Sequence, residues 1–275
     1  MTAEALAPAR YPTAKSPGFT GLLRAEWVKI SSVRSTGWVL LMMLMASVGV
    51  AVAASAVTAA QWDSASAADR AKVVDDPLSV IFSAFGVGEL IVCVLGVLVV
   101  TGEYSSGTIR ASILAVPRRS PLLAAKAAVF ALVTLAAGEL TSFASFFAGA
   151  ALLREHAPVA LGDPGVLRVV VGSGLFLAAM SLFALGVGAL VRHTAGAIAA
   201  VIGFLLVLAP LAGSLPGAAG EKAAAFLPAN AGQQIVFTHP DPDSVLTPWQ
   251  GLGVCALWGA ALITVAALLL RRRDV

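Results

Sequence analysis

The sequence predicts an all-α membrane protein with six transmembrane helices, and three observations lead to that prediction. Of its 275 residues, 59% are hydrophobic and only 12% are charged, whereas a soluble domain carries about 25% charged residues. Six apolar runs are each long enough for the roughly 20 helical residues that cross a ~30 Å hydrocarbon layer. These runs must be helical, because no water inside a bilayer satisfies free backbone groups.

The expected elements follow one another along a single membrane domain, residues 19–275. Residues 1–18 contain three prolines and no apolar core, so we expect a loose tail and no cleaved signal peptide. Residues 214–248 are too polar to span, and "EKAAAFL" within them predicts a short helix that Pro228 and Asn230 break. The expected spans cover about 37–60, 79–101, 122–153, 166–191, 195–213 and 249–270.

An amphipathic elbow helix is expected at residues 19–36, before the first span. Its apolar residues recur every three or four positions, which places them on one helical face flanked by basic residues. Such a helix suits the cytoplasmic interface of a membrane. It is either a plain anchor or a connection that also touches a cytoplasmic partner. The apolar face consists of Phe19, Leu22, Leu23, Trp27 and Ile30.

The distribution of basic residues predicts that both termini are cytoplasmic in a multi-pass plasma-membrane protein. With the N-terminus inside, 13 of the 18 Lys and Arg residues face the cytoplasm, as cytoplasmic loops prefer. The net charge of +3 therefore reflects topology and gives no reason to expect nucleic acid. The basic residues expected outside are Arg70, Lys72, Arg154, Arg168 and Lys222.

The loop after the second span, "TGEYSSGTIRASILAVPRRSP", is polar and rich in helix-breaking residues. Gly107 interrupts the helix, and Thr108 is a suitable N-cap for a short helix, "IRASILAV". Glu103 is placed to accept hydrogen bonds at that new helix start, and Pro117 ends the helix. A mere connector needs only a few residues. The loop is therefore either a docking element for another protein or an inert interfacial helix.

Residues of this loop and the elbow resemble the signature of ABC-2 type exporter permeases. The loop resembles that family's "GEY..GT" turn followed by "L..P..R......K". The segment "LRAEWVKISSVRSTGW" resembles the family's N-terminal "E..K..S.R.TW" pattern, and the endings "LPANAGQQI", "TPWQGL" and "RRRD" are also similar. The matching loop residues are Gly102, Glu103, Tyr104, Gly107, Thr108, Leu114, Pro117, Arg119 and Lys126.

The resemblance implies a non-catalytic permease subunit of an ATP-driven exporter. Such permeases pair with a second copy or a related permease and bind two copies of an ATPase subunit, which holds the ATP. The outer segment before the last span would hold short helices that cap the exit path. The loop would act as a coupling helix that contacts the ATPase through Glu103, Tyr104, Gly107, Thr108, Arg110, Leu114, Pro117, Arg119 and Lys126.

The residues themselves are consistent with that division of labour. The chain contains no Gly-Lys dipeptide, which the phosphate-binding loop of a nucleotide hydrolase requires. We therefore expect neither enzymatic activity nor a cofactor in this chain.

Two carboxylates, Glu89 and Glu139, fall near the centres of predicted spans. A charged carboxylate at that depth costs on the order of 3 kcal/mol or more. No lysine or arginine is expected at the same depth, so both are either protonated or beside a wet path. They are either residues of the transport path or hydrogen-bonding groups between helices.

The remaining reactive residues predict little chemistry. Cys93 and Cys255 lie in apolar runs and are expected to pack without a disulfide. The segment "HPDPD" offers His239, Asp241 and Asp243, but its prolines hold the backbone extended, and we predict no metal site.

Two other functions stay open. The first is a secondary carrier without an ATPase, although such carriers usually contain internal repeats, and none is evident here. The second is an ATPase-linked complex that senses or remodels the envelope without moving a solute.

Overall fold

A computed structural model describes residues 18–83, 85–108, 119–214, 217–239 and 244–272. Over these residues the chain is helical and contains no β-strand. The helices are α1 (Phe19–Ser32), α2 (Arg34–Ala60), η1 (Trp62–Ser64), α3 (Ala67–Asp75), α4 (Pro77–Ile81), α5 (Phe85–Ser105), α7 (Arg119–Leu153), α8 (Val166–Val191), α9 (Thr194–Gly203), η2 (Phe204–Leu208), α10 (Ala209–Gly213), α11 (Ala218–Ala225), α12 (Pro228–Gln233) and α13 (Pro248–Arg272).

Six helical segments in the described part of the chain are long and apolar enough to cross a membrane, which confirms the predicted all-α membrane class. The fifth of them is composite and runs through α9, η2 and α10. The segments are Arg34–Ala60, Phe85–Ser105, Ser120–Leu153, Val166–Val191, Thr194–Gly213 and Pro248–Leu270.

The second span begins later than the sequence predicted, at Phe85 instead of residue 79. Residues 77–81 form the separate short helix α4, in which Pro77 takes the first position. The Asp76 side chain caps this helix by accepting a hydrogen bond from the Ser79 backbone N–H at 3.3 Å. A capped start with proline is a strong local signal for a new helix. The apolar run is therefore divided between two helices.

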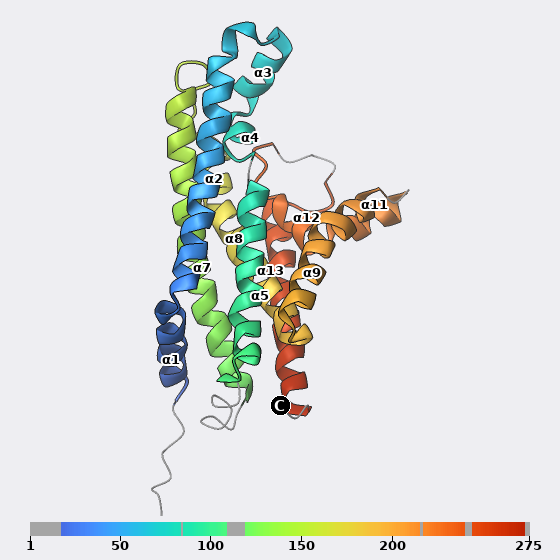
Figure 1. Ribbon diagram of the computed structural model, residues 1–275. Coiled ribbons are helices and arrows are strands. Elements are labelled where there is room, and N and C mark those ends of the chain that lie inside the picture. Colours follow the sequence, from blue (N-terminus) through green and yellow to red (C-terminus); the bar gives the residue numbers. More distant parts are fainter. Residues whose placement is uncertain (1–17, 84, 109–118, 215–216, 240–243, 273–275) are drawn as a thin grey trace, which may run out of the picture.

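Helix α8 is the central helix of the bundle and packs against α5, α7 and α13 (Figure 1). Glycines allow the close crossings. A Cβ atom on Gly96 of α5 would clash with the Ser181 backbone carbonyl of α8, and one on Gly188 would lie 3.2 Å from the Val97 Cα atom. Small residues at such positions let membrane helices approach closely.

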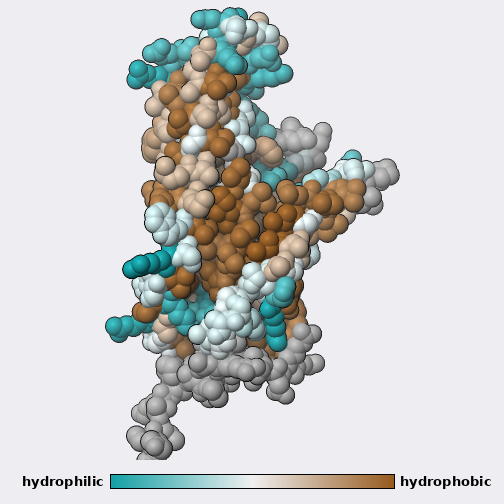
Figure 2. All heavy atoms as spheres, viewed as in Figure 1, coloured by the Kyte–Doolittle hydropathy of each residue, from teal (hydrophilic) through white to brown (hydrophobic). Residues whose placement is uncertain are grey.

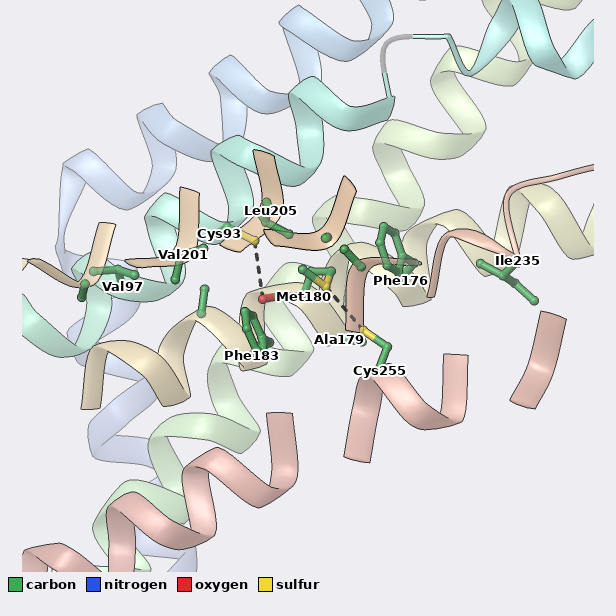
Figure 3. Packing of buried hydrophobic residues seen from close by; sticks show 14 residues of the cluster. Cys93, Val97, Phe176, Ala179, Met180, Phe183, Val201, Leu205, Ile235 and Cys255 are labelled. Carbon is green, nitrogen blue, oxygen red and sulfur yellow. Dashed lines mark hydrogen bonds between the residues drawn. The ribbon is translucent and has the colours of Figure 1, made fainter. Parts of the chain in front are cut away.

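The largest hydrophobic cluster lies between α5, α8, α9, α12 and α13 (Figure 3). Both cysteines are free thiols inside it, as the sequence predicted. The Cys93 Sγ atom lies 3.6 Å from the Met180 carbonyl oxygen, and the Cys255 Sγ atom lies 3.5 Å from the Met180 Sδ atom. The two thiols therefore serve as small packing groups on either side of Met180.

The fifth span contains a π-helical turn that the sequence did not predict. Helix α9 leads into η2, which is wider than an α-helix, and α10 follows directly. Pro210 lies just beyond this turn. In a regular α-helix its ring would meet the carbonyl group of Leu206, four residues earlier. The widened turn contains Leu206, so the helix deviates from α geometry where proline disturbs it.

The described residues of the outer segment 214–248 form two short helices, α11 and α12, and Asn230 does not break them as predicted. It lies inside α12, where its Nδ2 atom donates to the carbonyl oxygens of Ala209 and Ala224 at 3.2 and 3.1 Å. Pro228 is the first residue of α12 and so separates it from α11, which extends away from the bundle in Figure 1. Asn230 therefore joins α10, α11 and α12.

Further contacts attach this outer segment to the bundle. The Arg168 guanidinium of α8 donates to the backbone carbonyls of Phe237 and Thr238, both at 3.0 Å. The Trp258 Nε1 atom of α13 donates to the Phe226 carbonyl at 2.9 Å. From the "HPDPD" segment, the His239 Nε2 atom lies 3.2 Å from the Asp75 carbonyl oxygen, while Asp241 and Asp243 lie outside the described residues.

The surface agrees with a membrane environment. Figure 2 shows hydrophobic side chains over the middle of one face, and hydrophilic side chains gather at the end that carries α3 and near α1.

Candidate functional site

Helix α1 turns an acidic residue into the bundle. Its buried residues are Leu22, Glu26 and Ile30, which follow one another at four-residue spacing and so share one face. Phe19 and Trp27, which were expected on the apolar face with them, are each 50% exposed. The buried face is therefore rotated from the predicted one, and Glu26 lies in its centre against α7.

Four charged residues from three helices meet at this place. The Lys126 Nζ atom of α7 lies 2.7 Å from the Glu26 Oε2 atom and 2.8 Å from the Glu103 Oε1 atom of α5. The Lys29 Nζ atom of α1 lies 2.6 Å from Glu26 Oε1 and 3.0 Å from Glu103 Oε1. We call Glu26, Lys29, Glu103 and Lys126 the charge cluster.

Three members of the charge cluster are buried, the Lys29 side chain is 37% exposed, and the two acidic residues balance the two basic ones. The Glu26 and Lys126 residues are 0% and 4% exposed, and Glu103 is 9% exposed. Removing ions from water is costly, and mutual attraction compensates only when the geometry is good. Both oxygens of Glu26 and the Oε1 atom of Glu103 satisfy that condition, while the Glu103 Oε2 atom has no hydrogen-bond partner among the described residues. Loss of any one member would leave an uncompensated buried charge.

Lys29 lies in α1, outside the spans, and its pKa is raised above the ordinary value of 10.5. Burial alone would lower this pKa, but hydrogen bonds and attraction from Glu26 and Glu103 outweigh burial. A raised pKa means that the stabilising contribution of Lys29 is complete at neutral pH. It is lost only as the pH rises through the raised value.

The charge cluster joins the two helices that flank the predicted coupling loop. Glu103 lies in the last turn of α5, which ends at Ser105, and Lys126 lies near the start of the described part of α7. Gly107 has a φ of +72°, a conformation that favours glycine, so the predicted break at Gly107 is confirmed. The expected role of Glu103 as a helix cap stays a prediction, while its Oε1 atom accepts from the two lysines.

The other predicted loop residues are placed only in part. Tyr104 lies beneath the Arg192 guanidinium, whose Cζ atom is 5.5 Å from the ring centroid. The Thr108 hydroxyl contacts the Ser106 hydroxyl. Arg119 is the first described residue of α7. Arg110, Leu114 and Pro117, with the predicted helix "IRASILAV", lie outside the described residues.

Glu89 lies apart from the charge cluster, near the opposite end of α5. Because α5 begins at Phe85, Glu89 is four residues, or about 6 Å, from that helix end and not at mid-span as predicted. Its side chain is buried, and its Oε2 atom accepts a long hydrogen bond of 3.4 Å from the Gln233 Nε2 atom. Its Oε1 atom has no hydrogen-bond partner in the described part of the protein.

Glu139 lies in the middle of α7 and packs on a glycine of α8. A Cβ atom on Gly174 would lie 2.5 Å from the Glu139 Cδ atom, so the carboxylate occupies the space that a side chain would fill. Its Oε2 atom has no hydrogen-bond partner among the described residues. Glu139 and Glu89 therefore belong to different environments, although the sequence grouped them.

The sequence singled out two members of the charge cluster, Glu103 and Lys126, whereas Glu26 and Lys29 entered only through the elbow pattern. A signal was present, because Glu26 stands four residues from both Leu22 and Ile30 and so shares their face. The pairing of Glu26 with both Lys29 and Lys126 could be recognised only from the three-dimensional structure.

A search with protein-family models found no match to this chain, and a search of curated proteins found no significant match either.

Proposed function

We propose that this chain is the membrane permease subunit of an ATP-driven exporter, paired with a second permease and with two copies of a separate ATPase. The observation that carries the proposal is the charge cluster. The resemblance to ABC-2 permeases selects Glu26 and Lys29 from the elbow and Glu103 and Lys126 from the loop region. These residues, up to 100 positions apart, make direct contacts with one another.

In this proposal the charge cluster transmits force from the loop to the membrane helices. A motor that pushes on residues 106–118 acts on the ends of both α5 and α7. Separating these ends would break the Glu103–Lys126 contact and leave each of these buried charges with one partner fewer, and breaking a buried ion pair costs about 3–5 kcal/mol. The cheaper response is a movement of α1, α5 and α7 together, which carries the displacement into the spans.

The assignments of the individual residues follow from this role. Glu103 and Lys126 hold the loop ends together, Gly107 provides the bend, and Tyr104 and Thr108 lie beside it. The ATPase contact would be made by the loop residues Arg110, Leu114, Pro117 and Arg119. ATP would be bound by the partner, and the translocation path would lie between two permease copies with Glu89 or Glu139 beside it.

The first test is purification of the tagged protein from its own cells in a mild detergent, followed by mass spectrometry. The proposal expects an ATP-hydrolysing subunit in about equal amount, and hydrolysis in the purified complex. Recovery of the permease alone, together with compound accumulation in vesicles driven by an ion gradient, would support the secondary carrier instead. Hydrolysis without ATP-dependent uptake of any tested compound would favour the envelope-sensing complex.

The second test is Gly107→Pro. Proline fixes φ near −65° and cannot adopt the +72° of Gly107, so the bend must change while the spans stay intact. We expect normal insertion, with ATP hydrolysis by the complex but loss of ATP-dependent uptake into inside-out vesicles. Gly102→Ala is the matched control, because Gly102 is helical and a Cβ atom there meets nothing within 4 Å. Retention of both ATPase binding and uptake by Gly107→Pro would remove the coupling role.

A further inference from the structure

A pocket of about 370 Å³ lies between α5, the π-helical turn η2, α10 and α12. Its volume is in the range of sites for small organic molecules, about 300–1,000 Å³. Most of its wall is apolar, and its polar lining residues are Ser83, Glu89, Asn230 and Gln233, of which Glu89 and Gln233 are hydrogen-bonded to each other. The apolar wall includes Val87, Leu90, Leu205, Leu206 and Pro210.

Glu89 is the acidic group of this pocket and lacks a full set of partners. It is 4% exposed, its single hydrogen bond to Gln233 is long, and its Oε1 atom accepts no hydrogen bond from the described residues. The pocket lining contains no lysine, arginine or histidine among the described residues. The protein therefore supplies no described cation for a carboxylate that it places in an apolar surrounding.

We propose that this pocket binds an amphipathic organic cation. Its ammonium group would donate to the Glu89 carboxylate, and its apolar body would pack against Val87, Leu90 and Leu206. A buried carboxylate is compensated best by a paired charge with a hydrogen bond, and the ligand would supply both. That such a cation is the exported cargo rests on the proposed function, whereas the binding itself does not.

The neighbouring residues make the pocket specific for a ligand that has both an ammonium group and an apolar body. The Asn230 amide group is held by two backbone carbonyls, and Gln233 is held by Glu89. Both residues belong to α12, which is packed against α13 and α8. These polar groups are therefore preorganised, and a neutral apolar molecule in the pocket would leave the Glu89 carboxylate without a cationic partner.

The test measures equilibrium binding of two probes to the purified full-length protein in lipid nanodiscs, without nucleotide. Biphenylmethylammonium is the cationic probe, and biphenylmethanol has the same shape without charge. Binding to empty nanodiscs is subtracted. We expect the wild-type protein to bind the ammonium probe about tenfold or more tightly than the alcohol, which corresponds to about 1.4 kcal/mol.

Two variants locate the site. Glu89→Gln retains the shape of the side chain and removes its charge, so the two probes should bind within about threefold of each other. Gly86→Leu fills the pocket, because a Cβ atom on Gly86 meets nothing within 4 Å. It should weaken both probes at least about tenfold while Glu89 is kept. Glu155→Gln is the control for loss of a negative charge, because Glu155 is exposed and lies outside the pocket.

Each outcome decides the proposal. A wild-type protein without preference for the cation overturns it, as does an unchanged preference in Glu89→Gln. Unchanged binding of both probes by Gly86→Leu also overturns it, and this variant remains informative if Glu89→Gln fails to fold. Cation binding without a co-purified ATPase would support the site and contradict the proposed exporter. A co-purified ATPase without cation binding would support the exporter and contradict the site.

Discussion

Glu26 shows how much a single residue can depend on its partners. A carboxylate with no exposed surface is unfavourable by itself, and the two lysines that neutralise it come from different places in the chain. Lys29 is in the same helix three residues on, and Lys126 comes from α7. The negative charge of Glu26 opposes burial of the side chain alone, but its pairing with Lys126 of α7 fixes the position of α1 on the bundle.

Lys126→Met will therefore destabilise the protein strongly. The variant keeps the apolar stem but leaves Glu26 and Glu103 with one lysine between them, so the free energy of unfolding should fall by about 3–5 kcal/mol. The measurement is unfolding in mixed micelles with increasing sodium dodecyl sulfate.

Lys72→Met is the matched control for this prediction. Lys72 pairs with Asp69 at 3.6 Å, and both side chains are largely exposed, so the expected loss is about 0–1 kcal/mol. An equal, small effect of the two substitutions would mean that the charge cluster contributes little stability.

At this scale the sequence predicted the residue types better than their contacts. Glu103 and Lys126 were singled out from the resemblance, and Gly107 was identified as the break. The elbow pattern placed Leu22, Trp27 and Ile30 on one apolar face, whereas Leu22 and Ile30 share their buried face with Glu26, and Trp27 is half-exposed. The spacing of apolar residues predicts that a helix has an apolar face, but the neighbouring helix determines which residues become buried.

Helix α8 lies at the centre of the bundle. It is surrounded by α5, α7 and α13, and glycines are placed where these neighbours cross it. The sequence predicted its bounds, 166–191, because a long apolar run with no internal proline leaves little choice. It also suggested that glycines permit close approach. Which helices cross at each glycine depends on the assembled bundle and could not be predicted.

Gly96→Ala should separate α5 from α8. The added methyl group would clash with the Ser181 carbonyl and lie 3.1 Å from the Leu185 backbone nitrogen, so backbone must move. Overpacking of this kind costs about 1–3 kcal/mol, which thermal unfolding in detergent would measure.

Gly203→Ala is the control for the substitution itself. A Cβ atom there meets nothing within 4 Å, and alanine favours helix by up to about 1 kcal/mol over glycine. We expect unchanged or slightly raised stability. Similar losses in both variants would mean that the α5–α8 crossing is not tightly packed.

For the whole molecule, the balance of charged and apolar residues is enough to define the class of protein. Six spans were predicted, and six helical segments of the required length and composition are present in the described part of the chain. The start of α5 and the π-helical turn were missed, because both depend on how proline redirects a backbone within an apolar run.

The predicted orientation can be tested with two introduced cysteines. Ser64 follows the first span and Ser105 ends the second, and both residues are exposed. With cytoplasmic termini, Ser64→Cys should react with a membrane-impermeant maleimide on intact cells, and Ser105→Cys should react only after permeabilisation. Native Cys93 and Cys255 are buried, so the unmodified protein is the background control. The reverse labelling pattern would invert the topology.

The widened turn η2 makes one place in the fifth span tolerant of a change in length. A π-helical turn accommodates one residue more than regular geometry would. Removing a single residue from Phe204–Leu208 would let the turn close to α-helical geometry, while α10 keeps nearly the same orientation. The same deletion within α9 would rotate everything beyond it by about 100°, and Ala209 would no longer present its carbonyl to Asn230. The fifth span can therefore lose a residue at η2 and keep the wall of the neighbouring pocket, whereas a loss one turn earlier would rebuild that wall.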